Sequence, residues 1–220
     1  MLIHIIIDVV CIVTMKSKLK ILIFATLEEA NPLINKLKIN QVFEKPFKVF
    51  KNNELIVIIS GIGKIRATAA CAYAIGEFGK SNEYEILNIG AAGSLNSSFS
   101  IGDIRTIEMV ADCTETHVKS KIKTPTIQGL KSATLLTSDV TILSLDTRKN
   151  LSHYGELVDM EGFAIAKTAA IFGKKVSFLK IVSDTPENTS KNEIIKNIQS
   201  VSQLLVDEIV EFILRGQSMV

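Results

Sequence analysis

Short apolar runs alternate with longer helical patterns along most of the chain. The apolar runs predict strands at 19–25, 102–114 and 133–140 and a hairpin at 48–60. They also predict a strand that ends in a Gly/Ala loop at 85–95, a strand that runs into a polar loop at 175–188, and a strand that becomes a helix at 156–173. Helical patterns follow at 27–37, 61–79, 161–173 and 192–216. Residues 115–132 are polar and irregular. Strands that alternate with helices predict an α/β fold with three layers, in which helices cover both faces of a twisted, mixed and largely parallel sheet.

The first 14 residues do not continue this pattern. They are apolar but interrupted by His4 and Asp8, and they are too short to span a membrane. They also lack the basic start and the cleavage site of a secretory signal. Because Met15 follows directly, we expect residues 1–14 to be an N-terminal extension outside the fold and residues 15–220 to form a single domain. A weak membrane-associated leader is the alternative.

Composition excludes several classes of function. The 25 basic and 23 acidic residues nearly balance, and no basic stripe with interleaved aromatic residues suggests nucleic-acid binding. The three cysteines, Cys11, Cys71 and Cys113, are widely spaced, and the three histidines do not cluster. The sequence therefore indicates neither a disulfide framework nor a metal site, and a reducing cytoplasm is the simplest setting.

Four polar or glycine-rich segments follow predicted strands: "TLEEA", "GAAGS", "LVDMEG" and "SDTPEN". Ligands of open α/β sheets bind at the carboxyl ends of the strands, so these segments could meet at one cleft. Taken singly, Glu28 and Glu29 are ordinary acids at a helix start, and Asp184 is an ordinary turn residue. Glu161 is harder to explain in this way. It opens an almost wholly apolar helix, and a buried carboxylate needs a partner.

In their order along the chain, five segments resemble the nucleoside phosphorylase and nucleosidase superfamily, above all the 5′-methylthioadenosine/S-adenosylhomocysteine nucleosidases. These segments are "KILIFATLEEANPLI", "SGIGKIRATAA", "NIGAAGSLNSSFSIGDI", "LVDMEGFAIA" and "LKIVSDTPEN". The resemblance implies hydrolysis of the N-glycosidic bond of a purine nucleoside, with release of adenine and without a cofactor. It also implies a role in methionine salvage and a homodimer, for which the helix "ATAACAYAIGEF" is a candidate interface.

The same resemblance assigns roles to individual residues. Asp184 would protonate the leaving purine, and Glu29 would activate the attacking water, with Glu28 as the fallback. Glu161 would accept hydrogen bonds from the ribose hydroxyls, and Met160 would pack on the sugar. The other substrate-binding candidates are Ala92 and Gly93 in the glycine loop, Ile142 as an apolar wall for the base, and Ser183, which would position the neighbouring carboxyl group.

The chain also departs from the superfamily pattern. Phosphorylases carry an arginine where Asn88 stands and a hydroxyl where Ala91 stands, so the resemblance favours water over phosphate as the nucleophile. The nucleosidases usually have serine at Ala91, arginine at Lys180 and an aromatic residue at Thr141. These departures leave three alternatives open: a phosphorylase, a nucleosidase for another nucleoside, and a non-catalytic nucleoside-binding relative.

Overall fold

The computed structural model describes residues 19–79, 84–188 and 190–214, so the proposed extension at residues 1–14 lies outside the described residues. Within this part of the chain the strands are β1 (Leu19–Phe24), β2 (Asn40–Phe43), β3 (Lys48–Lys51), β4 (Leu55–Ile59), β5 (Tyr84–Ser94), β6 (Ile104–Cys113), β7 (Val118–Lys123), β8 (Ser132–Thr137), β9 (Leu157–Asp159) and β10 (Val176–Asp184). The helices are α1 (Leu27–Lys36), α2 (Lys64–Phe78), α3 (Leu145–Leu151), α4 (Gly162–Ile171) and α5 (Lys191–Leu214).

The strands form one mixed sheet that closes on itself at one end. Strands β4, β1, β5 and β10 are parallel neighbours, and β3 and β2 continue this sheet in antiparallel pairing. Strand β10 also pairs with β6, β6 with β8, β8 with β9, and β9 with β5, which completes a ring of five strands. In this ring Gly93 of β5 lies beside both Asp184 of β10 and Val158 of β9.

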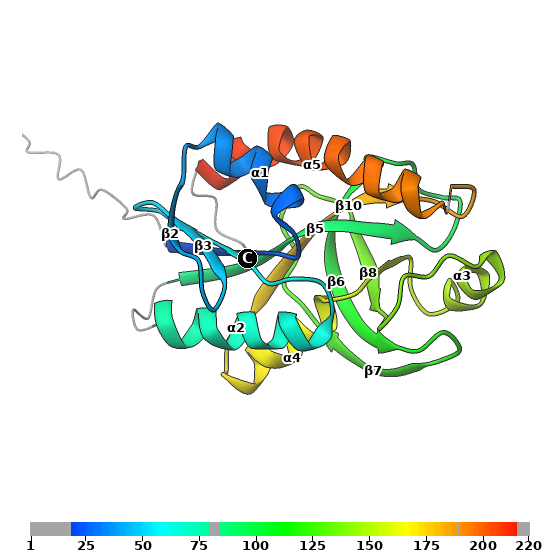
Figure 1. Cartoon of the computed structure of the whole chain (residues 1–220). Coiled ribbons are helices and arrows are strands. Elements are labelled where there is room, and N and C mark those ends of the chain that lie inside the picture. The colour runs from blue at the N-terminus through cyan, green and yellow to red at the C-terminus, as the bar shows by residue number, and fades with distance from the viewer. Residues whose placement is uncertain (1–18, 80–83, 189, 215–220) are drawn as a thin grey trace, which may run out of the picture.

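Helices cover both faces of the sheet. Figure 1 shows α1 and α5 together on one face and α2 and α4 together on the other. Side chains alternate along β1 as in any strand: Leu22 and Phe24 belong to the core under α1 and α5, whereas Ile21 and Ile23 pack on the α2 side. The predicted three-layer α/β/α fold is therefore confirmed. No helix in the described residues is long and apolar enough to cross a membrane.

Some local expectations were wrong. The "GAAG" segment is not a loop, because Gly90 and Ala92 continue the ladder of β5 and pair with Lys180 and Val182 of β10. The segment expected to be irregular contains β7, which pairs with β6. Strand β2 and helix α3 also had no counterpart in the predicted elements. The hairpin, the remaining strands and the four longer helices lie where the sequence pattern placed them.

Candidate active site

The four strand-end segments meet at the carboxyl edge of the sheet. The backbone N–H of Ala91 donates a hydrogen bond to Glu29 Oε1 (2.9 Å), which joins the segment after β1 to β5. Gly93 pairs in register with Asp184 on one side and with Val158 on the other. The predicted convergence of these segments is confirmed.

A small cleft of about 50 Å³ lies at this edge. Its lining consists of Gly93, Val140, Thr141, Ile142, Arg148, Val158, Asp159, Met160 and Asp184. Four of the predicted site residues line it: Gly93, Ile142, Met160 and Asp184. The cleft is much smaller than a typical ligand pocket of about 300 Å³ or more, so a nucleoside requires the segment around Ile142 or nearby side chains to move.

A larger cavity of about 490 Å³ lies elsewhere, between α4, the start of β10 and the segment from Ile122 to Pro125. Three lysines and several apolar side chains line it, and none of the predicted site residues does. Size alone would favour this cavity. The chemistry favours the small cleft, because two buried carboxylates, Asp159 and Asp184, line it.

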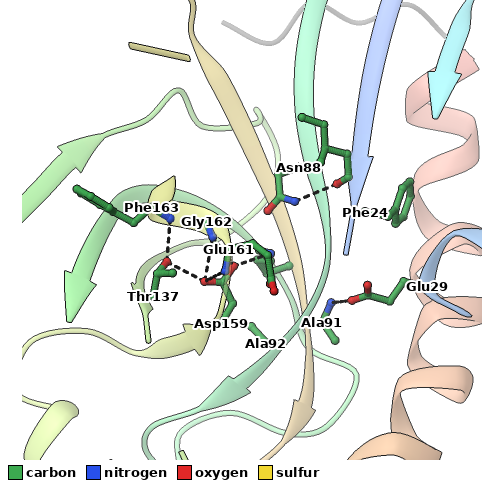
Figure 2. A network of polar contacts seen from close by, with 12 residues as sticks. Phe24, Glu29, Asn88, Ala91, Ala92, Thr137, Asp159, Glu161, Gly162 and Phe163 are labelled. Atoms are coloured by element: carbon green, nitrogen blue, oxygen red, sulfur yellow. Dashed lines mark hydrogen bonds and ion pairs between the residues drawn. The ribbon is translucent and has the colours of Figure 1, made fainter. Parts of the chain in front are cut away.

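The two carboxylates of "LVDMEG" have different surroundings (Figure 2). Asp159 accepts hydrogen bonds from Thr137 Oγ1 (2.8 Å) and from the Gly162 N–H (3.0 and 3.1 Å), and it forms a buried ion pair with Lys180 Nζ (2.9 Å). These contacts tie the turn to the start of α4 and to the ring of strands. Asp159 therefore orients the turn.

Glu161 is buried but only partly engaged. Its side chain is 7% exposed, and Oε1 accepts a hydrogen bond from the Gly63 N–H (2.7 Å). Gly63 has a φ of +98°, a conformation that glycine adopts readily. With this conformation the turn before α2 directs the Gly63 N–H towards Glu161. In the described part of the chain, Glu161 Oε2 has no hydrogen-bond partner. This second oxygen is therefore left for a ligand.

The ionisation of Glu161 reflects the same surroundings. Burial raises its pKa to about 7, and the negative charge of Asp159 acts in the same direction. Lys180 and the hydrogen bond from Gly63 oppose this rise. Near neutral pH the carboxyl group is consequently poised between its neutral and its charged form.

Glu29 has both a structural role and a place at the site. It completes a capping box with Thr26, because Oε2 accepts from the Thr26 N–H (2.9 Å) while Thr26 Oγ1 accepts from the Glu29 N–H (3.3 Å). Its Oε1 reaches β5, where a Cβ at Gly90 would lie only 2.7 Å away. Glu29 is buried whereas Glu28 is exposed, so the geometry favours Glu29 of the two. Glu29 is not part of the cleft lining itself.

Asp184 ends β10 and is held from two sides. Ser183 Oγ donates to Asp184 Oδ1 (2.6 Å) and also contacts the Ala92 carbonyl (3.3 Å), so Ala92 supports Ser183 through its backbone. On the other side Arg148 Nη2 forms a buried ion pair with Asp184 Oδ2. Sequence reasoning missed Arg148. It lies in a short polar helix with nothing in its pattern to distinguish a buried arginine from a solvent-exposed one.

The remaining candidates shape the cleft. Ile142 is buried in its wall, as the sequence suggested, whereas Thr141 is exposed. Thr141 Oγ1 lies 3.7 Å from the sulfur of Met160, which is half-buried. The two side chains bring the segment after β8 against the turn that carries Glu161.

Comparison with known proteins agrees with this arrangement. No family model matches the chain. A curated relative, the 5′-methylthioadenosine/S-adenosylhomocysteine nucleosidase of Buchnera aphidicola, is 26% identical over 217 residues, which cover 83% of this chain and 89% of the relative. The resemblance seen in the motifs is thus confirmed by a match over most of both chains.

Solved structures give the fold. The 5′-methylthioadenosine/S-adenosylhomocysteine nucleosidase of Helicobacter pylori matches with a TM-score of 0.77 and 19% identity over 92% of this chain and 100% of its own. The futalosine hydrolase of the same organism matches with a TM-score of 0.78 and 19% identity over 91% and 99%. The chain has the nucleoside phosphorylase and nucleosidase fold. At this level of identity the structures establish the fold, and the site must be argued from the chain's own residues.

Proposed function

We propose that the protein is a nucleosidase that hydrolyses the N-glycosidic bond of a purine nucleoside, 5′-methylthioadenosine or S-adenosylhomocysteine, and releases adenine. The observation that carries this proposal is the convergence of three buried carboxyl groups, Glu29, Glu161 and Asp184, on one edge of the sheet. The relative from Buchnera bears the name of this activity.

Each carboxyl group has a distinct task in the proposed reaction. Glu161 accepts hydrogen bonds from the ribose hydroxyls through its free oxygen, and Met160 packs on the sugar. Asp184 gives a proton to the purine as the bond between the base and the anomeric carbon breaks. A water molecule adds to that carbon and passes its proton to Glu29. Ser183 holds Asp184 in place, and no cofactor takes part.

Water rather than phosphate is the proposed nucleophile. Ala91 offers no hydroxyl, and the side-chain amide of Asn88 donates to the Ile23 carbonyl (2.9 Å) rather than towards a ligand (Figure 2). The Ala91 N–H, a natural anion contact, is already taken by the carboxylate of Glu29. An incoming phosphate would therefore meet a negative charge where a phosphorylase needs a positive one.

A nucleosidase for a different purine nucleoside is the second candidate. Thr141 stands where the resembling nucleosidases have an aromatic residue, and the charged side chain of Arg148 lines the base end of the cleft. Among the structural neighbours with the same fold, the futalosine hydrolase is named for a different substrate. A panel of nucleosides that vary in base and in 5′-substituent distinguishes the two candidates.

We also propose that the protein works in the cytoplasm, in methionine salvage, as a homodimer. The thiols of Cys71 and Cys113 are buried and unpaired, as expected in a reducing compartment. Two apolar residues are exposed at the start of helix α2. Ile62 lies just before the helix, and Ile65 in its first turn is 88% exposed. Such residues suit an interface between two copies. Light scattering at micromolar concentration measures the oligomeric state, and a monomer would contradict the proposed homodimer.

The decisive experiment is hydrolysis in phosphate-free buffer. Purified protein should release adenine and a free sugar from 5′-methylthioadenosine, which chromatography measures. Glu29→Gln should lower turnover by about a hundredfold while the pocket keeps its shape. Glu28→Gln, which changes the exposed neighbour, is the matched control and should leave turnover unchanged. Strict dependence on phosphate, or no base release from any nucleoside, would contradict the proposal.

A further inference from the structure

Arg148 is the largest fully buried side chain in the described residues, with 1% of its surface exposed. A buried guanidinium is stable only where its charge and its N–H groups find partners. Here it has three. Nε donates to the Ile142 carbonyl (2.9 Å), Nη1 donates to the Ser94 carbonyl (2.7 Å), and Nη2 pairs with Asp184.

These partners come from three separate segments of the base end of the cleft. Ile142 follows β8 and lines the cleft, Ser94 ends β5, and Asp184 ends β10. One planar group thus fixes the apolar wall and the carboxyl group relative to each other. The guanidinium fork suits this task, because its donors point in fixed directions. Gly93 leaves room for it, since a Cβ there would lie 2.7 Å from Asp184 Oδ2 and 3.3 Å from Arg148 Nη2.

The carboxyl group of Asp184 keeps free hydrogen-bonding positions in this arrangement. A carboxylate can accept at about four positions, and the structure uses one for Arg148 and one for Ser183. In the ion pair with Arg148 the carboxyl group of Asp184 is ionised, so it takes up a proton from solvent before the glycosidic bond breaks. When Asp184 passes this proton to the base, a negative charge forms on it again in a buried place. A fixed cation beside that charge stabilises it at the moment it develops.

We propose that Arg148 is a positioning residue for the leaving base: it orients Asp184, stabilises the charge that Asp184 acquires on proton transfer, and holds the Ile142 wall against the base. This inference rests on the proposed nucleosidase function and deepens it. It predicts that loss of Arg148 lowers turnover only for substrates whose leaving group must be protonated.

The test compares two leaving groups. 5′-Methylthioadenosine needs a proton on its purine, whereas 4-nitrophenyl β-D-ribofuranoside releases a stable anion without one. For Arg148→Met, kcat on the purine substrate should fall by about a hundredfold, the scale of lost general acid catalysis, while kcat on the nitrophenyl riboside stays within about threefold. Asp184→Asn should show the same split. Glu29→Gln should slow both substrates, because both need the activated water.

Arg105→Met is the matched control. Arg105 is also largely covered and pairs with an aspartate, Asp103 (3.2 Å), but it does not line the cleft. It should change neither rate. Equal losses on both substrates for Arg148→Met, with Arg105→Met unchanged, would mean that Arg148 only supports the fold and would overturn the inference. An unchanged purine rate would overturn it as well.

A second variant covers the case in which Arg148→Met does not fold. Arg148→Lys keeps the charge, but its single nitrogen cannot reach the three acceptors that Nε, Nη1 and Nη2 of the arginine contact separately. The ratio of purine to nitrophenyl turnover should still fall by about tenfold or more, and an unchanged ratio would overturn the inference. Failure of the proposed function is distinguishable, because the unmodified protein would then cleave neither substrate.

Discussion

Glu161→Gln should change how the stability of the protein depends on pH. Burial raises the pKa of Glu161 from 4.5 to about 7, so the folded protein holds this proton up to a higher pH than the unfolded chain does. The stability contributed by the neutral carboxyl group is fully present below pH 4.5 and is lost as the pH rises through about 7. The difference between 4.5 and about 7, at 1.36 kcal/mol for each pH unit, corresponds to about 3 kcal/mol.

Denaturant unfolding of the wild type and of Glu161→Gln, at intervals from pH 4.5 to 8, measures this effect. The variant should match the wild type at low pH, because a glutamine resembles the neutral acid. Its advantage in unfolding free energy should then grow to about 3 kcal/mol above pH 7. Glu28→Gln, an exposed carboxylate, is the control and should show a nearly constant difference.

Binding should depend on pH with the opposite sign. The ribose hydroxyls need the charged carboxylate, so the affinity for an unreactive nucleoside analogue should rise by about tenfold between pH 6 and pH 8. In Glu161→Gln the affinity should be weaker and nearly independent of pH. Calorimetric titration measures both. A difference in unfolding free energy that stays flat with pH, or a variant whose affinity still follows the wild-type curve, would refute the reasoning.

Two further substitutions test the neighbouring contacts. Gly90→Ala places a Cβ 2.7 Å from Glu29 Oε1 and displaces the carboxylate, so steady-state turnover should fall by about tenfold or more. Gly76→Ala is the control, because a Cβ there meets no neighbouring atom. It should leave turnover unchanged and raise the unfolding free energy by about 0.5–1 kcal/mol. Lys180→Met leaves the buried charge of Asp159 without its cation and should lower the unfolding free energy by about 3–5 kcal/mol in denaturant titration. A turnover loss of the same size at both glycines, or an unchanged denaturation midpoint at Lys180, would contradict these expectations.

The sequence pattern was sufficient for the parts of the fold that bury apolar surface. Strand β1 was predictable because it is a short continuous run of buried apolar residues, and helix α2 because its buried residues recur with helical spacing. Strands β2 and β7 were not, since β2 is wholly exposed and β7 is a row of lysines with two half-buried residues. Closure of the five-stranded ring also escaped prediction. It depends on β10 pairing with both β5 and β6, and such long-range pairing leaves no local signal.

For the site, the motifs located the acids but not their partners. Glu161 was recognisable because a carboxylate stood at the start of an apolar helix, and the structure buries it. Its actual partner, the N–H of Gly63, lies 98 residues away and could not be deduced from spacing. Arg148 lies between the half-buried Thr147 and the exposed Lys149, so nothing local reveals its burial. Electrostatic partners of this kind are determined by tertiary packing.

The "GAAG" segment shows how one short sequence serves two acids. Side chains alternate between the faces of a strand, so Gly90 and Gly93, three positions apart in β5, lack a Cβ on opposite faces. The missing Cβ of Gly90 makes room for Glu29, and the missing Cβ of Gly93 makes room for Asp184 and Arg148. The two glycines thus let two carboxyl groups of the protein approach the same strand from its two sides. This is how the proposed base for water and the proposed acid for the purine, far apart in the sequence, come to contact positions only three residues apart in β5.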